Sequence, residues 1–418
     1  MRIILGLLIS ALLASQASAR AEAAWVQMTG EGAAVRAVTS HLQCPVLKVD
    51  GKVRAMRERA GADEAFANRI CQADLPKRAR TATLDGHPLA LPKARPNRLV
   101  IFGDTGCRVV QGLVQNCSDA VAGWPFAQVA ALAAAKKPDL VIHVGDYYYR
   151  EAPCPPKTDA CAGSPFGDKW PTWKAELFDP GKPLLAAAPW VFARGNHEDC
   201  RRGGAGWFRL LDADRAVRAC RQDALTASDP FTVDIGGVKL AVLDSADADD
   251  SKDQPQLATA FGLDLARVLP ADEPVWIVTH RPLWALSHSG LTTGGDWGNV
   301  NLRAGAKAHG LEGVDLIVAG HIHNFTSLDF GKARPPSLIV GSGGTAMDPR
   351  DRPKPQVLDL PVDGLPAKAL TFGDFGYFVL DRKGAGWAGV FRDTEDRVIA
   401  SCTIKGASLK CVPVDRTN

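Results

Sequence analysis

Short apolar runs separated by polar, glycine-rich connections dominate the chain from Leu99 onward. The runs are rich in Val, Ile and Leu, a composition typical of buried strands. Between two of them, the stretch from Phe126 to Lys137 has the composition of a helix. This alternation of strands and helices predicts an α/β fold.

Two further regions read as antiparallel strands. Residues 231–235 and 238–243 flank Gly236 and Gly237, a pattern that predicts a β-hairpin. The tail from Phe375 to Ile404 predicts two or three more strands. Parallel and antiparallel strands together predict a mixed sheet system.

The first residues have the pattern of a secretory signal peptide. Arg2 precedes an apolar stretch of twelve residues, 3–14, and the small residues Ala17, Ser18 and Ala19 form a cleavage site. A membrane anchor is the alternative, but the stretch is shorter than the roughly 20 residues that a spanning helix needs. We therefore expect residues 1–19 to be removed and the protein to be periplasmic or secreted, with no membrane span afterwards.

The composition changes near residue 96. Residues 20–96 are rich in Ala, Arg and Lys and end in a Pro- and Arg-rich stretch at 91–96. We interpret 20–96 as a small N-terminal region and 97–418 as the catalytic domain.

Overall composition indicates a globular protein and narrows its partners. Of 418 residues 46% are hydrophobic, which excludes a disordered chain. The formal net charge is only +3, so nothing favours nucleic acid or an anionic membrane as partner. The oligomeric state is left open.

Ten cysteines follow the predicted signal peptide, an even number in an oxidising compartment. No two have the tight Cys-x2-Cys spacing of a thiolate metal site. Disulfides are therefore expected, although their connectivity does not follow from the sequence. In chain order the cysteines form five neighbouring couples: Cys44/Cys71, Cys107/Cys117, Cys154/Cys161, Cys200/Cys220 and Cys402/Cys411.

Five of the apolar runs end in polar residues able to bind a metal. In open α/β sheets, ligands gather outside the carboxyl ends of the strands, so these loops can converge despite their distance in sequence. Each motif alone is weak, since Gly-Asp can be a simple turn and His-x-His an exposed strand pair. The motifs are Gly103-Asp104-Thr105-Gly106, Gly145-Asp146-Tyr147-Tyr148-Tyr149, Gly195-Asn196-His197-Glu198, His280 and Gly320-His321-Ile322-His323.

The donor types favour a centre with two metals. Carboxylate, amide, phenol and imidazole groups suit Fe, Mn or Zn better than soft Cu(I). A bridging carboxylate can hold two cations about 3.5 to 4 Å apart, an arrangement suited to phosphoryl displacement.

Together and in this order, the motifs resemble the calcineurin-like metallophosphoesterase superfamily, and more closely its purple acid phosphatase branch. The resemblance covers about residues 99–330 and rests most on Asp146-x-x-Tyr149. The wider superfamily usually has Asp-x-His in the first motif, whereas Gly106 stands here. The resemblance implies an α/β fold of two mixed β-sheets packed face to face with flanking helices, in αββα layers.

The resemblance also implies a ligand set. The first metal would take Asp104, Tyr149 and His323, the second would take Asn196, His280 and His321, and Asp146 would bridge them. It implies Fe(III) beside Tyr149, and the hard, anionic donors there agree with a trivalent ion. The second metal would be divalent Fe, Zn or Mn. Ile277 stands where the fourth motif usually has Val, a conservative departure.

Two histidines are candidates for catalysis in an exported phosphatase that hydrolyses a small phosphate monoester by attack of metal-bound hydroxide. His197, beside Asn196, would donate to a phosphate oxygen or to the leaving group. His288 follows a stretch similar to the tartrate-resistant branch, in which a second histidine faces the substrate, but the spacing here is one residue shorter. Activity at mildly acid pH is expected.

Three alternatives remain. A phosphodiesterase or nucleotide hydrolase would use the same metals, with different residues around the rim of the active site. A non-catalytic binding protein would usually have lost ligands, and all seven positions are filled. A serine hydrolase would need a Gly-x-Ser-x-Gly elbow, which does not occur.

The stretch Gly341-Ser342-Gly343-Gly344 lacks the Lys of a P-loop and is interpreted as a turn.

Overall fold

The computed structural model describes residues 20–223, 225–270, 273–286, 298–347 and 354–415. The predicted signal peptide, residues 1–19, and the candidate His288 lie outside the described residues.

The first sheet has eleven strands within the described residues, and its centre is parallel. Leu140 pairs with Leu99 and Val141 with Trp190, so three strands run side by side in the same direction. Residues 99–102 are buried because both faces of the sheet are covered. The strand order is β25 (Leu409–Pro413), β24 (Val398–Ile404), β23 (Gly386–Asp393), β22 (Gly376–Lys383), β9 (Arg98–Phe102), β12 (Leu140–His143), β13 (Trp190–Phe192), β1 (Ala23–Thr29), β2 (Gly32–Thr39), β6 (Arg69–Leu75) and β5 (Arg57–Ala60).

The second sheet has eight strands in the described part of the chain. The predicted hairpin is confirmed as β14 and β15, whose turn holds Gly236 and Gly237 at φ 78° and 91°. Only glycine adopts such left-handed conformations without strain. The order is β14 (Phe231–Asp234), β15 (Lys239–Val242), β16 (Val275–Val278), β17 (Val314–Ala319), β19 (Ser337–Val340), β18 (Phe325–Asp329), β21 (Leu365–Phe372) and β20 (Gln356–Val362).

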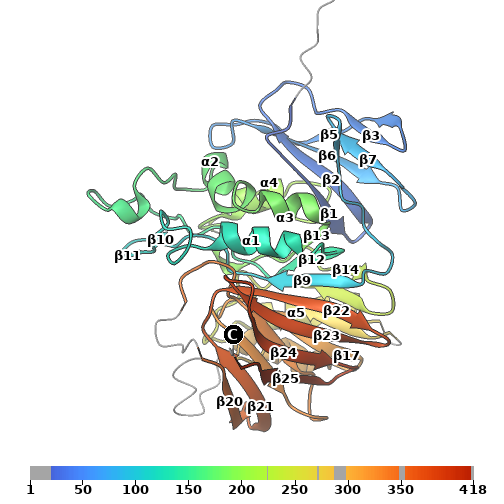
Figure 1. Ribbon diagram of the computed structural model, residues 1–418, viewed down its shortest axis with the longest axis vertical. Coiled ribbons are helices and arrows are strands. Elements are labelled where there is room, and N and C mark those ends of the chain that lie inside the picture. The colour runs from blue at the N-terminus through green and yellow to red at the C-terminus, as the bar shows by residue number, and fades with distance from the viewer. Residues whose placement is uncertain (1–19, 224, 271–272, 287–297, 348–353, 416–418) are drawn as a thin grey trace, which may run out of the picture.

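The two sheets pack face to face, and helices cover their outer faces (Figure 1). Phe325 of the second sheet lies 5.6 Å from Phe378 of the first, measured between ring centroids. Helices α1 (Phe126–Ala135) and α3 (Lys182–Ala187) pack on the first sheet, and α5 (Pro255–Val268) and α7 (Val300–His309) on the second. The predicted αββα layers are confirmed.

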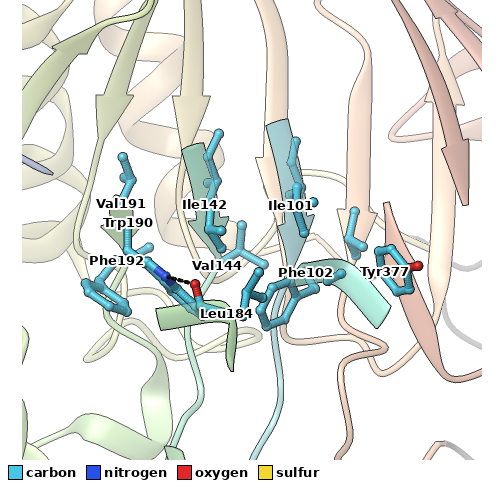
Figure 2. Close-up of a cluster of buried hydrophobic side chains, with 14 of the residues drawn as sticks. Ile101, Phe102, Ile142, Val144, Leu184, Trp190, Val191, Phe192 and Tyr377 are labelled. Atoms are coloured by element: carbon cyan, nitrogen blue, oxygen red, sulfur yellow. Dashed lines mark hydrogen bonds between the residues drawn. The ribbon is translucent and has the colours of Figure 1, made fainter. Parts of the chain in front are cut away.

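The outer layer of the first sheet is densely aromatic. Figure 2 shows Phe102, Trp190 and Phe192 among the side chains of β9, β12 and β13, with the indole of Trp190 donating a hydrogen bond to the carbonyl of Leu184 at 3.2 Å. These side chains are almost fully buried. Apolar burial of this kind contributes roughly 25 cal/mol per Å² and holds α3 on the sheet.

Residues 20–96 continue the first sheet. Gln27 of β1 pairs with Trp190 of β13 in parallel, and β2, β6 and β5 follow outward, in blue in Figure 1. A small four-stranded sheet completes this region, in the order β4 (Lys52–Arg54), β3 (Leu47–Val49), β7 (Ala82–Leu84) and β8 (His87–Pro88). The domain boundary at residue 96 stays a prediction.

All ten cysteines are paired, and each pair is one of the five couples that neighbour each other in sequence. The predicted tail strands are β22 to β24, and β25 adds a fourth, joined to β24 by the Cys402–Cys411 disulfide. Within the described ranges, no helix has the length and apolar character needed to cross a membrane.

Candidate metal centre

The polar loops after β9, β12, β13, β16 and β17 meet at one edge of the two packed sheets. This follows from the topology: the first three strands run parallel in one sheet and the last two run parallel in the other. The structure brings together all seven side chains that the sequence proposed as metal ligands. They are Asp104, Asp146, Tyr149, Asn196, His280, His321 and His323.

One half of the site lies around the phenol of Tyr149. Its Oη is 2.7 Å from Asp146 Oδ2, 2.9 Å from His323 Nε2 and 3.4 Å from Asp104 Oδ1. Asp104, Asp146 and His323 offer ligand atoms that all lie within 4.8 Å of one another. Two carboxylates, a phenol and an imidazole therefore surround one position, a hard donor set that fits a trivalent cation.

The other half lies around His280. Its Nε2 is 3.0 Å from Asn196 Oδ1 and 3.1 Å from Asp146 Oδ2. Asp146, His280 and His321 form a second cluster of ligand atoms within 4.8 Å. Asp146 belongs to both clusters, so its carboxylate would be available to both metal positions.

Hydrogen bonds leave one nitrogen of each imidazole free for a metal. His280 Nδ1 lies 2.8 Å from the Val144 carbonyl, and His323 Nδ1 lies 2.9 Å from the Ala346 carbonyl, so both can donate there and offer Nε2. His321 Nε2 lies 2.9 Å from Asp250 Oδ2, which leaves Nδ1. Such outer partners set the tautomer and orientation of metal-binding histidines.

The backbone at the site is strained. Asp104, Asp146 and His321 have φ values of 56°, 60° and 72°, in the left-handed region that L-residues seldom adopt. Residues held this way cost of order 1–3 kcal/mol each and gather at functional sites. The tight turns place the side chains of these three residues toward one another.

Buried Glu198 holds two of the loops together. Its carboxylate accepts hydrogen bonds from the amides of Asp146, Tyr147 and Tyr148 after β12 and from Gly195 after β13, at 2.8 to 3.0 Å. Burial and the charge of Asp146 raise the pKa of Glu198 to about 8. The negative groups of this site therefore repel one another unless a cation compensates them.

Burial and neighbouring charges shift the pKa values of three candidate ligands. Burial together with Asp146 and Asp104 raises the pKa of Tyr149 well above its usual value. Burial opposes protonation of His280, but Asp146 and Asp104 outweigh it and raise the pKa of His280 to about 9. Burial and Arg281 lower the pKa of His321 to about 4. A bound cation would replace the protons on Tyr149 and His280.

Gly106 explains why Tyr149 fits. A Cβ atom at position 106 would come closest to Glu176 Oε2, and within 2.8 Å of Tyr149 Cδ2 and of the Tyr147 carbonyl oxygen. The usual histidine of the first motif and the tyrosine of the second would therefore compete for the same space. The buried carboxylate of Glu176, in the π-helical turn Lys174–Phe178, accepts from the Tyr149 amide at 2.8 Å and fixes the loop.

His197 lies beside the ligands in the short helical turn Asn196–Glu198. Its ring packs against Tyr149, tilted by 32° at 3.8 Å between centroids, and its Nε2 is 3.9 Å from Asp146 Oδ2. His197 Nδ1 contacts Glu151 Oε1 at 2.5 Å, so Nε2 faces the centre. Burial lowers the pKa of His197.

Sequence reasoning missed the residues that orient the ligands and His197. Glu151, Glu176 and Asp250 stand in no motif, and no spacing in the sequence indicates their partners. The stretch Gly341–Gly344 is irregular chain that packs on the Asp104 loop: the Gly343 amide donates to the Gly103 carbonyl at 2.9 Å.

Comparison with known proteins agrees with this architecture. The structure resembles a purple acid phosphatase, PPD1, from yellow lupin (Lupinus luteus) seeds, with a TM-score of 0.54 and 14% identity over 94% of this chain and 74% of that one. It also resembles PhoD, with a TM-score of 0.53 and 13% identity over 94% of this chain and 92% of that one. At these identities the likeness concerns the fold. No curated protein sequence matches the chain.

The sequence model of the calcineurin-like phosphoesterases matches residues 98–325, which is more than half of the chain and includes every candidate ligand. This chain therefore belongs to the calcineurin-like phosphoesterase family.

Proposed function

We propose that this protein is an exported phosphatase of the purple acid phosphatase type, which hydrolyses phosphate monoesters at a centre of two metals. The observation that carries the proposal is the phenol of Tyr149, 2.7 Å from the shared carboxylate of Asp146, in the space that Gly106 leaves open. A phenolate donor is what distinguishes this centre from one built on histidines alone.

The residues fit the implied metals. Asp104, Tyr149 and His323 would hold Fe(III), and Asn196, His280 and His321 would hold divalent Fe, Zn or Mn, with Asp146 between them. Metals held by these residues would supply a water of lowered pKa and positive charge to neutralise a phosphoryl group. The anionic donors around Tyr149 match the harder ion, and the neutral Asn196 and imidazoles match the divalent one.

His197 is proposed to act on the substrate directly. Its contact with Glu151 fixes the ring, and its packing against Tyr149 places Nε2 beside the carboxylate of Asp146. From there Nε2 can donate a hydrogen bond to a phosphoryl oxygen or a proton to the leaving group. His288 stays a sequence-based proposal for a second such group.

Two matched variants test this assignment. His197→Ala should keep both metals and slow monoester hydrolysis by roughly 10² to 10⁴-fold, the usual contribution of a positioned acid or base. Asp146→Ala should lose metal from both positions, because its carboxylate belongs to both clusters. Metal analysis and turnover are measured on the same samples. Full turnover of metal-loaded His197→Ala would remove His197 from the mechanism.

The substrate class is tested with phosphomonoesters, diesters and nucleotides assayed across about pH 4 to 9. We expect monoesters to be preferred, with activity on the acid side of neutrality. Cleavage of diesters alone would replace this proposal with the phosphodiesterase alternative.

Export is supported by the signal-like start of the sequence and by the five disulfides. Disulfides persist in oxidising compartments. Thiol titration of the denatured protein, isolated from the medium or periplasm without reductant, should find almost no free thiols. Eight or more would contradict export.

A further inference from the structure

Arg108 differs from the other arginines around the metal centre because no carboxylate among the described residues pairs with it. Arg150, Arg202 and Arg281 pair with Glu176, Asp199 and Asp250 respectively. For Arg108 the described part of the chain offers no ion pair. Its guanidinium lies over the ring of Tyr149, 5.1 Å from the centroid, and Nη2 lies 3.4 Å from both ring nitrogens of His323.

Those nitrogens cannot serve as acceptors once the site is assembled. His323 Nδ1 donates to the Ala346 carbonyl, and Nε2 is the atom left for the metal. Arg108 therefore retains several N–H donors with no acceptor among the described residues, within reach of the first metal position. The side chain is half-buried, so an incoming ligand has access to it.

The loop that holds Arg108 is rigidly built. Cys107, its neighbour, is disulfide-bonded to Cys117 across the hairpin of β10 (Val109–Val110) and β11 (Leu113–Val114). Gln115 Oε1 accepts a hydrogen bond from the backbone amide of Arg108 at 3.0 Å. The backbone amide of Gln115 donates to the Arg108 carbonyl at 2.8 Å.

The same glutamine connects Arg108 to His323. Gln115 Oε1 also accepts from the Ala346 amide at 3.0 Å, and the Ala346 carbonyl is the partner of His323 Nδ1. Arg108 and the ligand His323 thus share one support. An arginine whose backbone is already held in place loses less entropy when its side chain binds an anion.

We propose that Arg108 binds the phosphoryl group of the substrate from the Tyr149 side of the centre and thereby favours phosphate monoesters over diesters. The inference rests on the proposed function. A monoester carries one more terminal oxygen than a diester and, above a pKa of about 6, a second negative charge. A planar guanidinium recognises adjacent phosphate oxygens with two parallel hydrogen bonds.

Binding of inorganic phosphate to the metal-loaded protein tests Arg108 without catalysis. By isothermal titration calorimetry, Arg108→Met should weaken phosphate binding by roughly 10 to 100-fold, the effect of losing hydrogen bonds to a charged group. Arg108→Lys keeps the positive charge but cannot form two parallel hydrogen bonds. Its affinity for phosphate should lie between those of the wild type and Arg108→Met. The control is Arg201→Met, at an arginine whose side chain is 71% exposed, and it should change the affinity by less than about 2-fold.

Kinetics separate substrate selection from a general loss of activity. Arg108→Met should lower kcat/KM for a monoester by about the same 10 to 100-fold, while kcat/KM for a diester with the same leaving group should change by less than about 3-fold. Unchanged phosphate affinity in Arg108→Met with full metal content would overturn the inference. So would loss of metal in both Arg108 variants, which would make the residue a support for His323.

The phosphate titration separates failure of this inference from failure of the proposed function, because it needs no turnover. If the wild type cleaves only diesters, the proposed function fails. The phosphate titration still reports whether Arg108 binds an anion at the centre.

Discussion

At the scale of single residues, the metal centre depends on side chains that share very little space. At position 106 only glycine fits, because the carboxylate of Glu176 and the ring of Tyr149 occupy the volume next to it. Asp104 and Asp146 adopt left-handed backbone conformations that Asp tolerates better than most residues. Chemistry and backbone conformation therefore restrict the same positions, which explains why the motifs are recognisable in the sequence.

Tyr149→Phe should abolish the visible charge-transfer band that a phenolate bound to Fe(III) gives, because it removes the only donor of that type at the site among the described residues. Absorption spectroscopy with iron analysis checks this. Tyr147→Phe is the matched control, since the Tyr147 hydroxyl donates to the Ala193 carbonyl instead and the band should persist. A band that survives in Tyr149→Phe would assign the phenolate to another tyrosine.

At the scale of elements, helix α4 (Gly204–Leu210) connects the His197 turn to the N-terminal strands. At its start, Asp168 accepts from the Gly206 amide at 3.1 Å and from the Trp173 indole at 2.8 Å. At its end, Arg36 of β2 and Arg59 of β5 donate to the carbonyls of Leu210 and Phe208. Backbone amide and carbonyl groups at both ends of α4 thus find hydrogen-bond partners in residues far away in sequence.

Asp168 predicts a pH-dependent contribution to stability. Burial raises its pKa to about 6. The unfolded chain loses this proton at lower pH than the folded protein does, so folding becomes less favourable as the pH rises from about 4 through 6. Asp168→Asn does not titrate and should gain stability relative to the wild type over that window.

Because the Asp168 side chain keeps some contact with solvent, we expect a gain of about 1–2 kcal/mol at pH 8. At pH 4 Asp168 is protonated in the folded protein, so the difference in unfolding free energy between variant and wild type should contain only the part that does not depend on pH. Urea unfolding at both pH values measures this. A difference between variant and wild type that does not change with pH would show that Asp168 has an ordinary pKa.

At the scale of the whole molecule, the first sheet runs without a break from the C-terminal strands to the N-terminal ones. Buried Trp25 of β1 contacts Phe178 at 5.0 Å between ring centroids, and Arg36 is fully buried against the chain after α4. Residues 20–96 therefore cover apolar surface and carbonyl groups that belong to the remainder of the protein.

A chain of residues 97–418 should accordingly fail to fold into a soluble, metal-loaded protein. Removing β1 exposes the edge of β13 and the aromatic layer around Trp190, a surface prone to aggregation. Size-exclusion chromatography and metal analysis, with 20–418 as control, measure the outcome. A soluble and active 97–418 would instead support an independent catalytic domain.

Much of the fold and the ligand set could be predicted from local patterns. Apolar runs such as Leu99–Phe102 followed by Gly and Asp indicate a buried strand and a loop at its carboxyl end, because strand burial and turn chemistry both depend on neighbouring residues. The cysteine couples are local for the same reason. Each closes a short loop, and the pairing follows the order of the chain.

The tertiary structure alone decided what supports the ligands. Asp250 reaches His321 over 71 residues and Glu176 reaches Cys107 over 69, and no spacing rule links such positions. The joining of β1 to β13 depends equally on the packing of distant segments, which the change in composition near residue 96 does not reveal. The sequence by itself determined the strands, the turns and the ligand types, since these depend on local chemistry. The partners that orient the ligands, and the anion-binding role proposed for Arg108, depend on distances that only folding creates.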